Sequence, residues 1–333
     1  MQQEQTISST IRPTAGGSKA LRDRVVLLGL LALLIIGLLG AAAATGWSET
    51  LHQIQKLTLW QVCALLALSL MNYGLRGLRW HLFAKRLGLD LSLTTNMRHF
   101  LGGFAMTVTP GRVGELVRMR WIRRETGWAF ERTAPLVLVD RASDLAAMAV
   151  LLAGALLLST SKIAGGVPVT LLALLAAFIV TRPALLAWCA SLGYRTTGKA
   201  PRLFAKLRRA ASALAPFSQG GTLFQGSVLA FAGWLAEGLA FYLLLAWMGA
   251  DVTASTAIAI FLFSTLAGGL TGAPGGVGGA EAAMIALLSL EGVPLALSLP
   301  ATAIIRLTTL WFAIVIGLII FPIAERISKR IQT

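Results

Sequence analysis

The sequence predicts an all-α integral membrane protein with about six transmembrane helices and two re-entrant helical hairpins, arranged as an inverted repeat. Apolar residues make up 56% of the 333 residues and charged residues only 13%, whereas a soluble domain carries about a quarter charged residues. The long runs of Leu, Ala and Gly show no strand-like alternation, so helices are favoured over a barrel. Two apolar segments are interrupted by similar Pro-Gly sequences.

Six apolar runs are long enough to cross a hydrocarbon core of roughly 30 Å as helices of about 20 residues. They comprise residues 25–45, 57–75, 134–158, 167–190, 224–248 and 298–321. The first run lacks a clear small-residue cleavage site, so we expect an anchor and not a removed signal peptide. We expect residues 23–325 to form one transmembrane domain, between a disordered cytoplasmic segment at 1–22 and a cytoplasmic tail at 326–333.

The orientation follows from the basic residues. Residues 94–124 and 253–290 are broken by Pro and Gly, so we expect each to enter and leave the membrane on the same side. With a cytoplasmic N-terminus, 24 of the 29 Lys and Arg residues then lie on the cytoplasmic side. The basic loop 194–217 either lies on the anionic inner leaflet or is a solvated loop that only determines topology. The net charge of +15 is therefore attributed to the membrane and not to nucleic acid.

The two broken segments resemble each other. The first contains TPGRVGE (109–115) and the second APGGVGGAE (273–281). The separation from Glu115 to Arg141 matches that from Glu281 to Arg306 within one residue. We therefore predict two units of opposite orientation, at about 57–158 and 224–321, and in transporters such a repeat places the binding site at its interface.

Each hairpin contains residues that break a helix, because proline lacks an N–H and glycine permits tight backbone. The predicted breakers are Pro110, Gly111, Gly114, Pro274, Gly275, Gly276 and Gly278. The half-helix that follows has a partially positive N-terminus suited to an anion. Arg112 adds a full charge there, whereas Glu115 and Glu281 could bind substrate or only cap the helix. The alternative for each hairpin is a structural kink or an extramembrane loop.

Several charges fall inside predicted spans, where each costs several kcal/mol unless it is paired or solvated. The candidate substrate-binding residues are Arg112, Glu115, Arg118, Asp140, Arg141, Asp144, Glu237, Glu281 and Arg306. The acidic pair Asp140 and Asp144 could instead hold the first hairpin by pairing with Arg112 or Arg118. In the second unit, mutual pairing would satisfy Glu281, Glu237 and Arg306.

Other polar residues received a simpler interpretation. A protonated Glu237 is a second option, which would make it a candidate proton carrier, because burial disfavours the charged carboxylate. Arg76 and Arg79, at the end of the second predicted span, are expected to form an interfacial anchor or a plain positive-inside flank. The two cysteines and three histidines form no metal-binding spacing, so no metal, disulfide or cofactor is expected.

Together these elements resemble the membrane domain of lysylphosphatidylglycerol synthases, which also occurs alone as small flippase-like bacterial proteins. The resemblance covers roughly residues 20–325 and rests on LRGLRW (75–80), TPGRVGELVR (109–118), VDRASDL (139–145), the Trp234–Glu237 pair, APGGVGGAE (273–281) and Arg306. The family usually has Glu-Arg-x-x-Asp where this chain has Asp140-Arg141-Ala142-Ser143-Asp144. The chain ends at Thr333 without an aminoacyltransferase domain, so the resemblance implies lipid translocation and not lipid aminoacylation.

The expected function is therefore a lipid flippase or transporter in the bacterial inner membrane. It would move an anionic or lipid-linked polar headgroup by a passive or ion-coupled route, and its partners would be phospholipid, polyprenyl-linked or hopanoid lipids and anionic inner-leaflet lipids. One alternative is an accessory partner of a lipid or glycolipid synthesis enzyme, docked through the basic loop. A membrane-embedded lipid transferase is disfavoured because no catalytic constellation is recognisable.

Overall fold

The described part of the computed structural model, residues 47–107, 109, 113–158, 166–198 and 201–332, is helical, with no strand in these ranges. A short helix α2 (Trp47–Lys56) precedes the first unit. That unit consists of α3 (Leu59–Arg86), α4 (Leu93–Gly102), the 3-10 turn η1 (Gly103–Met106), α5 (Val113–Thr126) and α6 (Phe130–Leu158). The prediction of an all-α membrane protein is confirmed.

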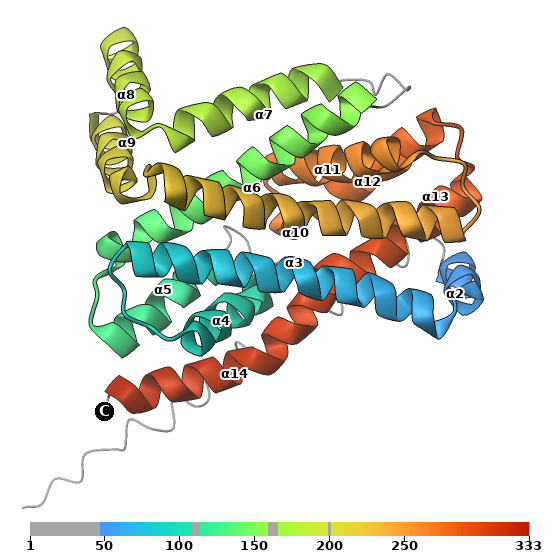
Figure 1. Ribbon diagram of the computed structural model, residues 1–333, viewed down its shortest axis with the longest axis horizontal. Coiled ribbons are helices and arrows are strands. Elements are labelled where there is room, and N and C mark those ends of the chain that lie inside the picture. The colour runs from blue at the N-terminus through green and yellow to red at the C-terminus, as the bar shows by residue number, and fades with distance from the viewer. Residues whose placement is uncertain (1–46, 108, 110–112, 159–165, 199–200, 333) are drawn as a thin grey trace, which may run out of the picture.

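The second unit follows after three connecting helices, α7 (Gly166–Thr181), α8 (Pro183–Thr197) and α9 (Pro201–Ala213), and the 3-10 turn η3 (Ala215–Phe217). It consists of α10 (Gly220–Trp247), α11 (Ala254–Leu270), the turn η4 (Pro274–Gly276), α12 (Gly279–Leu290), α13 (Leu295–Arg306) and α14 (Phe312–Gln332). A single π turn, η5 (Leu307–Trp311), joins α13 to α14 into one long bent element (Figure 1).

The two units run in opposite directions. Helices α3 and α10 lie side by side and antiparallel, with Asn72 against Gly233 and Phe83 against Gly226 (Figure 1). The α4–α5 pair packs against α14 of the second unit, and α11 packs against α6 of the first. Helices of each unit therefore pack against helices of the other.

Both broken segments fold back on themselves as helical pairs. In the first pair, a Cβ on Gly114 would lie 2.4 Å from the carbonyl oxygen of Gly103. In the second, a Cβ on Gly268 would lie 2.6 Å from the Cβ of Ala280. Small residues at comparable positions therefore allow the two helices of each hairpin to approach closely. Of the first set of breakers, Pro110 and Gly111 lie outside the described residues, as does the predicted binding residue Arg112.

Three helices in the described part of the chain are long and apolar enough to cross a membrane: Phe130–Leu158, Gly220–Trp247 and Leu295–Ile331. The run at 25–45 lies outside the described residues. The run at 57–75 is longer than predicted, because α3 continues to Arg86. The single span predicted at 167–190 is wrong: Arg182 is extended and Pro183 begins a new helix, so α7 and α8 are separate.

The basic side chains gather at one end of the bundle. The C-terminal end of α3, the start of α6, helix α9 and the C-terminus lie at this end (Figure 1). Its exposed arginines include Arg86, Arg123, Arg132, Arg202, Arg208, Arg209 and Arg326. At the opposite end of the described chain, Lys56 on α2 is the one Lys or Arg residue.

The close contact between α14 and η1 gives a test of this packing. A Cβ on Gly317 would lie 2.2 Å from the backbone nitrogen of Ala105, so Gly317→Ala must push α14 away from the hairpin. We expect it to lower the free energy of unfolding by about 1–3 kcal/mol, measured by thermal unfolding in detergent. The control Gly154→Ala adds its methyl to open space in α6. Equal melting temperatures for the two variants would contradict this packing.

Candidate functional site

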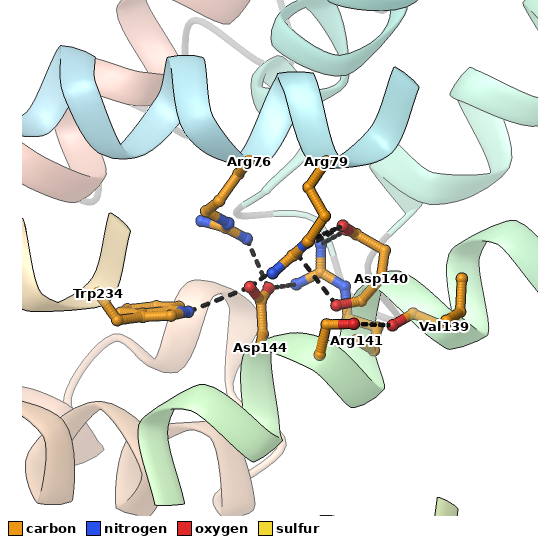
Figure 2. A network of polar contacts seen from close by, with 8 residues as sticks. Arg76, Arg79, Val139, Asp140, Arg141, Asp144 and Trp234 are labelled. Atoms are coloured by element: carbon orange, nitrogen blue, oxygen red, sulfur yellow. Dashed lines mark hydrogen bonds and ion pairs between the residues drawn. The ribbon is translucent and has the colours of Figure 1, made fainter. Parts of the chain in front are cut away.

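A buried cluster of ion pairs joins α3 to α6. Arg79 is fully buried, and its Nη2 donates to Oδ1 of Asp140 at 2.5 Å and to Oδ1 of Asp144 at 2.8 Å. The same nitrogen donates to the backbone oxygen of Asp140 at 3.1 Å (Figure 2). One guanidinium thus holds two carboxylates one helical turn apart.

Three further side chains complete the cluster. Arg76 donates from Nη2 to Oδ2 of Asp144 at 2.8 Å, and Trp234 of α10 donates from Nε1 to Oδ1 of the same carboxylate at 3.1 Å. Arg141 lies at longer range, 3.4 Å from Asp140 and 3.5 Å from Asp144 (Figure 2). Asp144 is therefore the point at which α3, α6 and α10 meet.

This arrangement corrects two interpretations. Asp140 and Asp144 pair with Arg76 and Arg79, which were not among the predicted partners; one of the predicted partners, Arg112, lies outside the described residues. The interfacial-anchor interpretation of Arg76 and Arg79 is wrong, because α3 remains helical through Arg86 and carries both side chains into the bundle. These two arginines were absent from the predicted site.

Arg118 is surrounded by aromatic rings. Its guanidinium carbon lies 4.3 Å from the ring centre of Phe100, 5.3 Å from Trp80 and 5.7 Å from Phe104. The side chain is only 3% exposed. Cation–π contacts stabilise this buried charge, and Arg118 also lines the cavity described below.

A second ion pair closes the other hairpin. Arg306 donates from Nε to Oε1 of Glu281 at 2.5 Å and from Nη2 to the backbone oxygen of Gly275 at 3.0 Å. The other oxygen of Glu281 accepts from the backbone nitrogen of Gly278 at 2.6 Å. Glu281 is therefore both a helix cap and the partner of Arg306, so the predicted pairing of these two residues is confirmed.

A cavity of about 580 Å³ lies where the two hairpins meet, within the range typical of small-molecule sites. Gly103 and Gly114 line it from the first hairpin, and Gly275 and Gly276 from the second. Its described wall carries six charged residues: Arg76, Arg118, Arg141, Arg306, Asp144 and Glu237. Positive charge is therefore in excess at the wall.

The cavity has an apolar side as well. Helix α7 contributes Val169, Leu172 and Ala173, and α11 contributes Leu266 and Leu270. Leu172 is 63% exposed and Leu270 76% exposed, so this wall adjoins the outer apolar surface of the bundle. The cavity combines a charged interior with a hydrocarbon-like side, as an amphiphile would need.

Most of the predicted site residues that the structure describes line this cavity or contact a residue that does. Asp140 lies behind the wall, 3.4 Å from the lining residue Arg141, and Glu281 borders the cavity through Arg306. The side chain of Glu115 lies outside the described residues. No group of three potential metal ligands occurs among the side chains that are described. Tyr73, which also lines the cavity, donates its hydroxyl to the backbone oxygen of Thr309 and was not predicted.

Long apolar helices around a charged, buried cavity define a multi-pass helical membrane protein. The chain belongs to the family described as lysylphosphatidylglycerol synthase TM region, whose model matches residues 25–317. Two "UPF0104 membrane protein" relatives from Methanothermobacter thermautotrophicus (strain ATCC 29096 / DSM 1053 / JCM 10044 / NBRC 100330 / Delta H) are similar to it. One is 33% identical over 103 residues (31% of this chain, 30% of the relative), and the other 28% identical over 111 residues (33% of each). The alignments thus span about a third of these relatives.

The buried cluster predicts a large effect of removing Arg79. Arg79→Gln leaves two carboxylates short of a cationic partner in a membrane interior, so we expect a loss of about 3–5 kcal/mol in the free energy of unfolding. The matched control is Arg326→Gln, at an exposed arginine on α14, and should change stability by less than about 1 kcal/mol. Denaturant titration of the purified variants distinguishes these outcomes. Equal free energies of unfolding for the two variants would contradict a stabilising role of the Arg79 ion pairs between α3 and α6.

Proposed function

We propose that this protein is a lipid flippase or transporter that moves an anionic or lipid-linked polar headgroup across the membrane. The observation that carries the proposal is the cavity, which places four arginines inside an apolar bundle at the junction of two opposed broken helices. In inverted-repeat transporters, substrate sites lie at this kind of junction. The family membership supports a lipid-related role in a membrane.

The chemistry of the wall suits a phosphate-bearing amphiphile. An arginine fork pairs with phosphate through two parallel hydrogen bonds, and it does so more strongly where water is excluded. The apolar wall from α7 and α11 would leave the tails in contact with lipid while the headgroup occupies the charged interior. Such a route needs no opening wide enough for a whole lipid molecule.

We infer that both helical pairs are re-entrant and that the basic end of the bundle faces the cytoplasm of the bacterial inner membrane. The positive-inside tendency favours this orientation because the exposed arginines gather at that end. The first hairpin then enters from the cytoplasm and the second from the outside. Arg118 lies on the cytoplasmic hairpin, so the headgroup would first be held from that side.

A reconstituted assay tests the transport proposal. Liposomes containing the purified protein and a trace of acyl-labelled phosphatidylglycerol should equilibrate the label between leaflets faster than protein-free liposomes, as read by dithionite quenching. Arg118→Gln removes one charged partner of the phosphate, worth about 1.5–3 kcal/mol, so we expect a roughly 10- to 100-fold slower rate. Arg118→Lys should recover only part of it.

The control for this assay is Arg326→Gln, which keeps the cavity intact and should match the unaltered protein. Two results would reject the flippase proposal: no acceleration by the unaltered protein, or the same rate for Arg118→Gln and the control. Formation of a new lipid product without translocation would favour the transferase alternative. Retention of a lipid-synthesis enzyme only through α9, without translocation, would favour the accessory partner.

Topology is tested separately by cysteine labelling in a Cys63→Ser, Cys189→Ser background, since both native thiols are free. Asp251 and Glu131 are exposed residues at opposite ends of the bundle. In intact cells, a membrane-impermeant maleimide should label Asp251→Cys and leave Glu131→Cys unlabelled until the membrane is opened. The reverse pattern would invert the proposed orientation, and labelling of both in intact cells would contradict the span assignment.

A further inference from the structure

Glu237 differs from the other described carboxylates in and beside the cavity wall. It lies in the middle of α10, is 6% exposed and reaches the cavity wall. Asp140, Asp144 and Glu281 each have an arginine partner. Glu237 forms no hydrogen bond or ion pair with another described residue. It is a buried acidic group that the packing of the described helices does not use.

The surroundings of Glu237 come from four packed helices. Helix α3 contributes Tyr73 and Arg76, α6 contributes Asp144, and α13 contributes Arg306. Helix α11 has no ionisable residue. The two arginines act on Glu237 electrostatically, but each donates its close hydrogen bonds to another carboxylate, Asp144 or Glu281.

This geometry sets a preference for the neutral acid. An ionised carboxylate without a hydrogen-bonding partner is costly in a water-poor interior, and a proton removes that cost. An anion bound to Arg76 and Arg306 would add negative charge near Glu237 and would neutralise the attraction of these arginines for it. Both effects increase the affinity of Glu237 for a proton.

We propose that Glu237 is a proton-binding site coupled to headgroup binding, so that the cavity takes up an anionic headgroup together with one proton. The proton comes from water in the cavity, resides on a carboxylate oxygen of Glu237 and returns to water when the headgroup leaves. A singly charged headgroup and one proton together add no net charge to the cavity. The inference rests on the proposed function for its ligand, and it names the coupling ion.

The coupling between proton binding and headgroup binding can be measured from the affinity for the headgroup. If the anion favours protonation of Glu237, protonation must favour the anion by the same factor. The affinity of the purified protein for a short-chain phosphatidylglycerol, measured by calorimetry between pH 5.5 and 8.5, should fall as pH rises. The decrease is about tenfold per pH unit at most, the limit for one proton. Calorimetry in buffers of different ionisation enthalpy should show proton uptake on binding.

The decisive variant is Glu237→Gln, which has the shape of the neutral acid and cannot titrate. We expect it to keep the low-pH affinity at every pH and to take up no proton. Glu237→Asp should retain a pH dependence, which also shows that position 237 tolerates a carboxylate change. Glu131→Gln, at an exposed residue far from the cavity, is the matched control and should behave as the unaltered protein.

Three results would overturn the proposal: a pH-independent affinity in the unaltered protein, the same pH dependence in Glu237→Gln, or no binding at any pH. Persistence in Glu237→Gln would assign the titration to another group, such as a histidine. Failure here is distinguishable from failure of the transport proposal. Lipid movement without pH-linked binding would reject the proton site alone, and pH-linked binding without lipid movement would reject transport alone.

Discussion

The structure depends on one interaction, the pair of charged hydrogen bonds from the buried Arg79 to Asp140 and Asp144. A lone charge at this depth would cost several kcal/mol, so neither α3 nor α6 can carry these side chains into the bundle without the other. With Arg76 and Trp234 added, Asp144 brings the long helix of the second unit to the same point. This cluster sets the relative positions of α3, α6 and α10. Its carboxylates also balance the charge of Arg76 and Arg141, which line the cavity.

The two units have similar hairpins, but the arginine that follows each hairpin is paired differently. Each has a helical pair closed by small residues, and in each an arginine follows the pair by nearly the same distance along the chain. In the second unit that arginine, Arg306, is tied to Glu281 and to the backbone of the break. In the first unit Arg141 lies at longer range from its carboxylates. The contacts of Arg141 with its carboxylates are therefore longer than that of Arg306 with Glu281.

The sequence predicted what depends on local signals. The Pro-Gly break at Pro274 and the pairing of Arg306 with Glu281 both follow from residues within the second unit. It did not predict the partners of Asp140 and Asp144. An arginine at the end of an apolar run can be a positive-inside flank or the buried partner of a carboxylate, and the sequence around Arg76 and Arg79 does not distinguish the two. The one available signal was the spacing. Arg76 and Arg79 are three residues apart and share a helix face, and Asp140 and Asp144 are four apart and share one, so the two pairs could face each other. The break at Arg182 was also readable, since the residue before a proline disfavours a helix.

The central claim is that the cavity holds the headgroup of a membrane lipid at its arginines. An electron cryo-microscopy structure of the protein in nanodiscs containing phosphatidylglycerol tests it most directly. The account predicts density for a lipid phosphate within hydrogen-bonding distance of Arg118 or Arg306, with its acyl chains leaving past α7 and α11. A cavity filled by the protein's own side chains, or lipid phosphates confined to the outer surface of the bundle, would contradict it.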